Sequence, residues 1–149
     1  MASIARLTRK KLGEILLEEG LISEQQVQDA LRQQHQQGIL FGEALVEQGL
    51  ITEDKMVSVL IEQFGIPYLD PCNYQVSDDL LVIFDPAMMR RFQFVPVDMI
   101  GSVLVVAIAG LLSEDLLGNM EQETGCTIQV FLTRMGAIRQ VLDQHGIGS

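Results

Sequence analysis

Two glutamines, Gln34 and Gln63, occupy equivalent positions in a segment that the chain repeats. The two copies are residues 11–34 (KLGEILLEEGLISEQQVQDALRQQ) and 40–63 (LFGEALVEQGLITEDKMVSVLIEQ), offset by 29 residues. Each glutamine ends an apolar stripe at helical spacing, formed by Val27 and Leu31 in the first copy and by Met56 and Leu60 in the second. The repeat thus places a glutamine, whose amide both donates and accepts hydrogen bonds, at the same point of two helical apolar stripes.

The sequence lacks the signatures of nucleotide hydrolases and of dinucleotide-dependent reductases. The three lysines, Lys10, Lys11 and Lys55, follow Arg9, Lys10 and Asp54, so none follows the glycine of a phosphate-binding loop. No GxGxxG pattern follows a predicted strand. The sequence therefore predicts no cofactor of these classes.

Metal and covalent chemistry are equally unsupported. His35 and His145 lie in polar segments near glycines, without an HExxH pattern or a set of cysteines, so we expect no metal site. Cys72 and Cys126 have neither metal-ligand spacing nor the local signature of a nucleophile, and we interpret both as reduced thiols. We therefore expect a non-catalytic protein.

Two neighbouring arginines, Arg90 and Arg91, have two interpretations. They could contact an anion or a partner, or they could complement the dipole at the end of a predicted helix.

Net charge argues against a broader nucleic-acid surface, since the chain carries −10 at pH 7 and such surfaces neutralise many phosphates. We expect neither DNA nor RNA as a partner.

Each repeat copy has the boundary residues of a helix, a turn and a second, longer helix. Gly20 and Gly49 stand where a left-handed C-terminal cap is needed, and Ser23 and Thr52 follow as N-caps. Ser23 and Gln26 fit a capping box. The first subdomain, residues 1–65, is therefore predicted to be two helix-turn-helix repeats.

The second predicted subdomain, residues 66–149, mixes strands and helices. A helix is expected from Ser77 through Phe84, and a second begins with Asp85 as N-cap and Pro86 at its first position. Strands are predicted at 94–97, 103–109 and 127–132, with a turn at 98–102 and helices at 113–125 and 135–146. The predicted fold class is α+β, with a helical subdomain followed by a small three-stranded sheet covered by helices.

The longest apolar stretch, near residues 103–112, is too short to span a membrane, which takes roughly 20 apolar residues. No apolar run follows the basic N-terminus, so we expect neither a signal peptide nor direct membrane insertion. The predicted location is the cytoplasm.

Residues 11–63 resemble the tandem motif of the N-terminal domain of type II secretion and type IV pilus assembly ATPases. In the members of that family that bind cyclic di-GMP, each copy begins Arg-Leu-Gly, ends in Gln and is separated from the other by five residues. The spacer here, HQQGI, also has five residues. The predicted elements of residues 66–146 are similar to the C-terminal half of that domain, so the resemblance covers nearly the whole chain.

The resemblance implies that each copy would hold half of a cyclic di-GMP molecule, as ligand rather than as cofactor. Carried over by position, the first half-site comprises Lys11, Leu12, Gly13, Gly20, Val27, Leu31 and Gln34, and the second comprises Phe41, Gly42, Gly49, Met56, Leu60 and Gln63. Where the family pattern has its leading arginine, this chain has Lys11 and Leu40. A lysine supplies a point charge instead of a planar fork, and a leucine supplies no charge.

The resemblance implies a docking and regulatory domain. Its expected partners are the cytoplasmic domain of an inner-membrane platform protein or adaptor and an ATPase core, in cis or in trans. Such a domain would lie at the periphery of the inner membrane through its protein partner. Two alternatives stay open: a cyclic di-GMP receptor, and a helical scaffold whose apolar stripes simply form the core.

Overall fold

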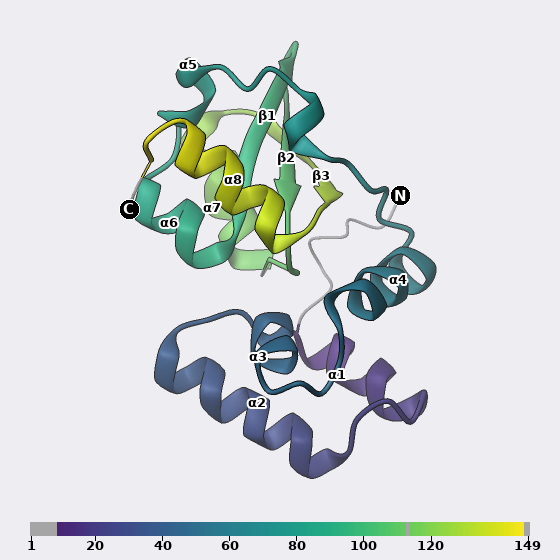
Figure 1. Ribbon diagram of the computed structural model, residues 1–149. Helices are drawn as coiled ribbons and strands as arrows, with labels where there is room; N and C mark the ends of the chain where they lie inside the picture. The colour runs from purple at the N-terminus through teal and green to yellow at the C-terminus, as the bar shows by residue number, and fades with distance from the viewer. Residues whose placement is uncertain (1–8, 113, 148–149) are drawn as a thin grey trace.

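A computed structural model of the protein describes residues 9–112 and 114–147. The chain forms a helical half, built from the two repeats, and an α+β half stacked on it (Figure 1). The α+β fold class is confirmed, with a three-stranded sheet and helices packed against it.

From residue 9 onward, the helical half contains four helices, α1 (Arg9–Glu18), α2 (Glu24–Gln37), α3 (Phe41–Glu47) and α4 (Glu53–Phe64). The predicted capping box is present, because Ser23 Oγ accepts from the Gln26 N–H at 3.2 Å and Gln26 Oε1 accepts from the Ser23 N–H at 2.8 Å. Thr52 Oγ1 accepts from the Lys55 N–H at 3.1 Å and so caps α4. The helix starts are therefore encoded locally, as predicted.

Gly20 and Gly49 end the two shorter helices in the left-handed conformation, each with φ +71°. After α1, the N–H of Leu21 donates to the carbonyl of Leu16 and the N–H of Gly20 to that of Leu17, both at 3.0 Å. The same pair of bonds follows α3, shifted by one repeat. Glycine adopts this backbone without the Cβ clash of other residues, so both predicted caps are confirmed.

The α+β half opens with the 3₁₀ helix η2 (Pro71–Asn73) and the short helices α5 (Asp78–Leu81) and α6 (Pro86–Phe92). Strands β1 (Phe94–Ile100) and β2 (Val103–Ile108) pair antiparallel, and helix α7 (Glu114–Thr124) crosses to β3 (Thr127–Leu132), which pairs parallel to β2. The final helix, α8 (Met135–Gln144), lies across one face of the sheet (Figure 1). Residues 67–69 add to β3, since the Leu132 N–H donates to the Pro67 carbonyl at 2.8 Å.

Two predicted boundaries in this half are wrong by three residues each. Strand β1 continues to Ile100 instead of ending at Val97, because a bulge between Pro96 and Asp98 absorbs one residue and the pairing then resumes. Helix α5 ends at Leu81 instead of Phe84, since the chain turns there and seats Phe84 edge-on against Phe94, with ring centroids 5.2 Å apart. Ser113, the expected cap of α7, lies outside the described residues.

Two apolar clusters meet where the halves join. The cluster of the helical half includes Ile66 and also Leu132, which comes from β3. Leu40 approaches Gly110 so closely that an added Cβ would lie 2.8 Å from Leu40 Cδ1. The predicted division at residues 65 and 66 stays a prediction, and the half-buried Val46 packs against both clusters.

Candidate functional site

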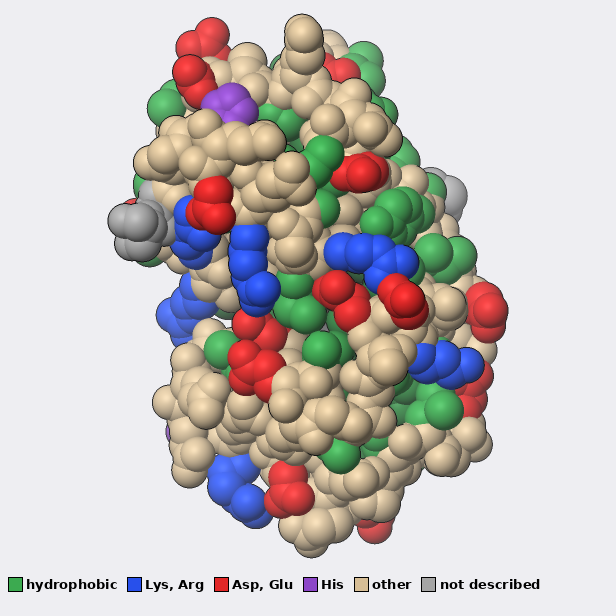
Figure 2. Space-filling view, in the orientation of Figure 1, with side chains coloured by type: hydrophobic (Ala, Val, Ile, Leu, Met, Phe, Trp, Pro, Cys, Tyr) green, Lys and Arg blue, Asp and Glu red, His purple; other side chains and the backbone are tan. Residues whose placement is uncertain are grey.

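The junction between the halves carries charged side chains from both sides. Arg139 of α8 lies 3.7 Å from the carboxylate of the buried Glu43, and Arg134 pairs with Asp54. Basic and acidic side chains form a belt across the middle of the molecule in Figure 2, at the level where the halves meet. Polar contacts therefore supplement the apolar packing of the junction.

The first predicted half-site is partly accessible. Leu12 and Gly13 are buried, Val27, Leu31 and Gln34 are half-buried, and Gly20 is exposed in the turn after α1. Lys11 belongs to α1, but its side chain lies outside the described residues. The apolar stripe and its terminal glutamine thus lie together on α2, as the spacing predicts.

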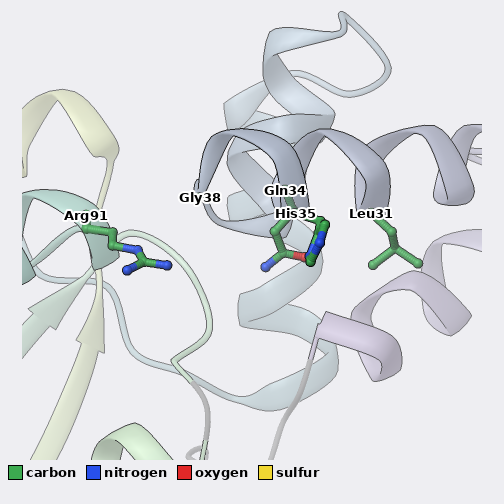
Figure 3. Close-up of a pocket in the computed structure, with 5 residues that line it drawn as sticks. All are labelled: Leu31, Gln34, His35, Gly38 and Arg91. Atoms are coloured by element: carbon green, nitrogen blue, oxygen red, sulfur yellow. The ribbon is translucent and has the colours of Figure 1, made fainter.

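A half-open hollow of about 330 Å³ lies at the C-terminal end of α2. It is lined by Leu31, Gln34, His35, Gly38 and Arg91. Figure 3 shows the Arg91 side chain pointing from α6 toward the end of α2, across an open space from Gln34. The hollow therefore combines the end of the first predicted half-site with a cation from the other half of the protein.

Arg90 and Arg91 have different surroundings although they are neighbours in the last turn of α6. Arg90 donates to the Ile147 carbonyl from Nε at 3.0 Å and to Asp143 from Nη2 at 2.6 Å, so it tethers the end of the chain. Arg91 is exposed, and its guanidinium lies 5.1 Å from the centroid of the Phe92 ring. Among the side chains that the structure describes, Arg91 has neither a carboxylate partner nor a hydrogen-bond acceptor.

The second predicted half-site is closed by its own side chains. Phe41, Met56 and Leu60 are buried in the core of the helical half, and Gly42 is buried with them. Gly49 is exposed in its turn. Gln63 is also exposed, and its amide donates to Glu19 at 3.3 Å. The structure brings these residues together, but the apolar part of the group has no free face.

Gly13 and Gly42, the third residues of the two copies, let the longer helix of each copy pack close to the shorter one. A Cβ on Gly42 would lie 2.5 Å from Met56 Sδ, which is closer than real side chains come. A Cβ on Gly13 would lie 3.5 Å from Phe41 Cζ and 3.8 Å from Val27 Cγ1, which are ordinary contacts. The packing of the second copy is therefore the tighter of the two.

No group of three or more His, Cys, Asp or Glu side chains among the described residues is arranged to hold a metal ion. In the same part of the chain, no helix combines the length and the apolar character needed to cross a membrane.

The hollow beside Arg91 is the candidate site that the structure adds to those predicted from the sequence. From the sequence, Arg90 and Arg91 share two interpretations, an anion or partner contact and a charged helix end, because nothing local indicates that only Arg91 lines the hollow with Gln34.

The chain is similar to proteins of pilus and secretion machines. The model of the MshEN domain family matches residues 64–148. The "Type IV pilus assembly ATPase PilB" of Myxococcus xanthus (strain DK1622) is 29% identical over 135 residues, a match that spans 91% of this chain and 24% of that protein.

Solved structures give the same assignment of fold. The chain resembles a structure of MshE with cyclic di-GMP (cdg), with a TM-score of 0.63 and 22% identity, over 89% of this chain and 96% of that one. It resembles the N-terminal domain of XpsE with a TM-score of 0.70 and 17% identity, over 97% and 98% of the two chains. These likenesses concern the fold.

Proposed function

The chain belongs to the MshEN domain family, and from that membership we propose that it is the non-catalytic docking and regulatory N-terminal domain of a type IV pilus or type II secretion ATPase. Its proposed partner is the cytoplasmic domain of an inner-membrane protein of the same machine, with an ATPase core in cis or in trans. The Myxococcus xanthus relative is named as a type IV pilus assembly ATPase, and it is about four times longer than the segment that matches this chain.

One observation carries the docking proposal: large apolar side chains are exposed at the end of the α+β half that is remote from the helical half. Val82, just after α5, is 75% exposed, and Ile100, at the end of β1, is 63% exposed. Helix α5 and the turn after β1 lie at this same end of the molecule (Figure 1). We call Val82, Ile83, Met99 and Ile100 the distal apolar residues.

Their position supports contact with a protein partner. Single exposed apolar side chains are common, whereas large apolar patches mark interaction surfaces, and two separate segments contribute to the distal apolar residues. The helical half covers the opposite end of the α+β half, so the distal apolar residues stay available when the repeats and the sheet are packed together.

The test is association of the purified chain with the cytoplasmic domain of the inner-membrane partner from the same machine. We expect the chain to be retained on that domain when it is immobilised, and not on an unrelated acidic protein of similar size. Failure of the wild-type chain to associate would contradict the docking proposal.

A second candidate function, binding of cyclic di-GMP, is favoured by the hollow at Leu31 and Gln34. An amide beside an apolar wall suits a base with hydrogen-bonding edges and a flat face. Calorimetric titration tests this candidate directly. We expect Gln34→Ala to abolish the heat of binding and Gln63→Ala to reduce it less. The Gln63 amide already donates a hydrogen bond to Glu19, and the apolar residues of its half-site are buried in the core.

A further inference from the structure

We infer that Arg91 is a ligand-binding residue that takes the phosphate of a guanine nucleotide in the hollow at the end of α2, so that the ligand is held between the two halves of the protein. The inference rests on the nucleotide site of the second proposed function and adds a residue from outside the repeats. It also specifies that one nucleotide unit occupies the site.

The pairing of the other arginines sets Arg91 apart. Among arginines whose side chains the structure describes, four form ion pairs with carboxylates: Arg32, Arg90, Arg134 and Arg139. Arg91 forms none within the described residues, in a chain with 20 acidic and 10 basic residues. A guanidinium that stays unpaired in so acidic a protein is available to an external anion.

The position of Arg91 points it at the predicted base-binding residues. A Cβ on Gly38 would lie 3.7 Å from both Nε and Nη2 of Arg91, so the guanidinium reaches the end of α2. Gln34 stands one turn before Gly38 on the same helix and lines the same hollow. A phosphate on Arg91 would therefore leave its base within reach of the Gln34 amide and the Leu31 side chain.

Arg91 is not needed as a cap for the C-terminal end of α2, because backbone groups already form that cap. The Gly38 N–H donates to the Gln34 carbonyl at 2.8 Å in a left-handed cap with φ +67°. In the described part of the chain, Arg91 donates no hydrogen bond to the carbonyls of that turn. Its N–H groups are thus free to form a bidentate contact with phosphate.

Size favours one nucleotide unit over two. The hollow, at about 330 Å³, lies at the lower end of the range for small-molecule pockets. The corresponding wall of the second copy, Phe41, Met56 and Leu60, is buried. Leu40 also supplies no cation there, whereas Arg91 adds a guanidinium to the first site.

The experiment is calorimetric titration of the full chain with cyclic di-GMP, GMP and inorganic phosphate. It compares wild type, Arg91→Ala, Arg91→Lys and Arg32→Ala. The last variant removes the same charge from an exposed arginine on α2 that is paired with Asp29, so it controls for net charge. Unchanged thermal midpoints establish that each variant is folded.

We expect Arg91→Ala to weaken binding of cyclic di-GMP at least about tenfold, because hydrogen bonds to a charged group are lost. Arg91→Lys should bind with intermediate affinity, and Arg32→Ala should match wild type. Binding of GMP that depends on Arg91, without binding of cyclic di-GMP, would support the inference and contradict the second proposed function.

Equal affinity of Arg91→Ala and wild type for cyclic di-GMP would overturn the role of Arg91 and leave that function standing. Absence of binding by both nucleotides would overturn both. Binding of inorganic phosphate as tight as that of the nucleotides would also overturn the inference, since it would show no contribution from the base.

Discussion

The carboxylate of Glu53, in the first turn of α4, accepts a hydrogen bond of 2.8 Å from the backbone N–H of Met135, the first residue of α8. The residue before it, Arg134, makes no capping hydrogen bond to α8 with its side chain and instead pairs with Asp54. The helical half therefore supplies the N-terminal cap of a helix in the α+β half. Folding of the last helix is coupled to docking of the repeats.

Glu53→Ala should destabilise the protein by about 1 kcal/mol, because an N–H at the start of α8 loses its acceptor. Glu24 is the matched control, since it has the same place in the first turn of α2 in the other repeat copy. Both substitutions remove a favourable charge at a helix N-terminus, so the difference between them isolates the cap. Urea denaturation gives both values, and equal losses would contradict the account.

Gly42→Ala should lower stability by about 1–3 kcal/mol, because the new Cβ forces Met56 to move within a filled core. Gly13→Ala should be neutral or stabilising, since its Cβ finds ordinary contacts and alanine favours helix. Met56→Val, which copies the residue of the first repeat, should recover part of the loss in Gly42→Ala. Thermal denaturation of the four proteins tests this, and identical midpoints for both alanine variants would rule out the packing difference.

Cys72 should be alkylated slowly at mildly alkaline pH. The Cys72 side chain is exposed, but desolvation by its neighbours, followed by the negative charge and hydrogen bonding of Asp70, raises the pKa of its thiol, so less reactive thiolate is present at a given pH. Asp70→Asn removes the charge but can still accept the Cys72 N–H, as Asp70 does at 2.9 Å. In a Cys126→Ser background, the inflection of the rate against pH should move down in Asp70→Asn. An unchanged inflection would show that Asp70 does not act on the thiol.

Much of the helical half could be predicted because its signals are local. The capping box of Ser23 and Gln26 spans three residues, and the glycine caps at Gly20 and Gly49 depend on backbone conformation alone. The end of β1 could not be predicted in this way, because the bulge near Asp98 arises from pairing with β2 and has no signal in its own segment.

Contacts between the halves could not be predicted in the same way. Glu53 and Met135 are 82 residues apart, and the sequence gives no sign that the first turn of α4 faces the start of α8. The candidate site could likewise be predicted only in part. Gln34 was identified from the repeat. The different contacts of Arg90 and Arg91 depend on which side of α6 faces α2 and which side faces Ile147.

The most direct test of the docking function is the affinity of the full chain for the cytoplasmic domain of its inner-membrane partner, measured by calorimetry with Val82→Asp/Ile100→Asp and with Ile61→Asp. Ile61 is the control because it is 37% exposed and belongs to the helical half. Burying an unpaired carboxylate at an interface is costly, so we expect the double variant to bind at least about tenfold more weakly and Ile61→Asp to match wild type. Wild-type affinity in the double variant would contradict docking through the distal apolar residues.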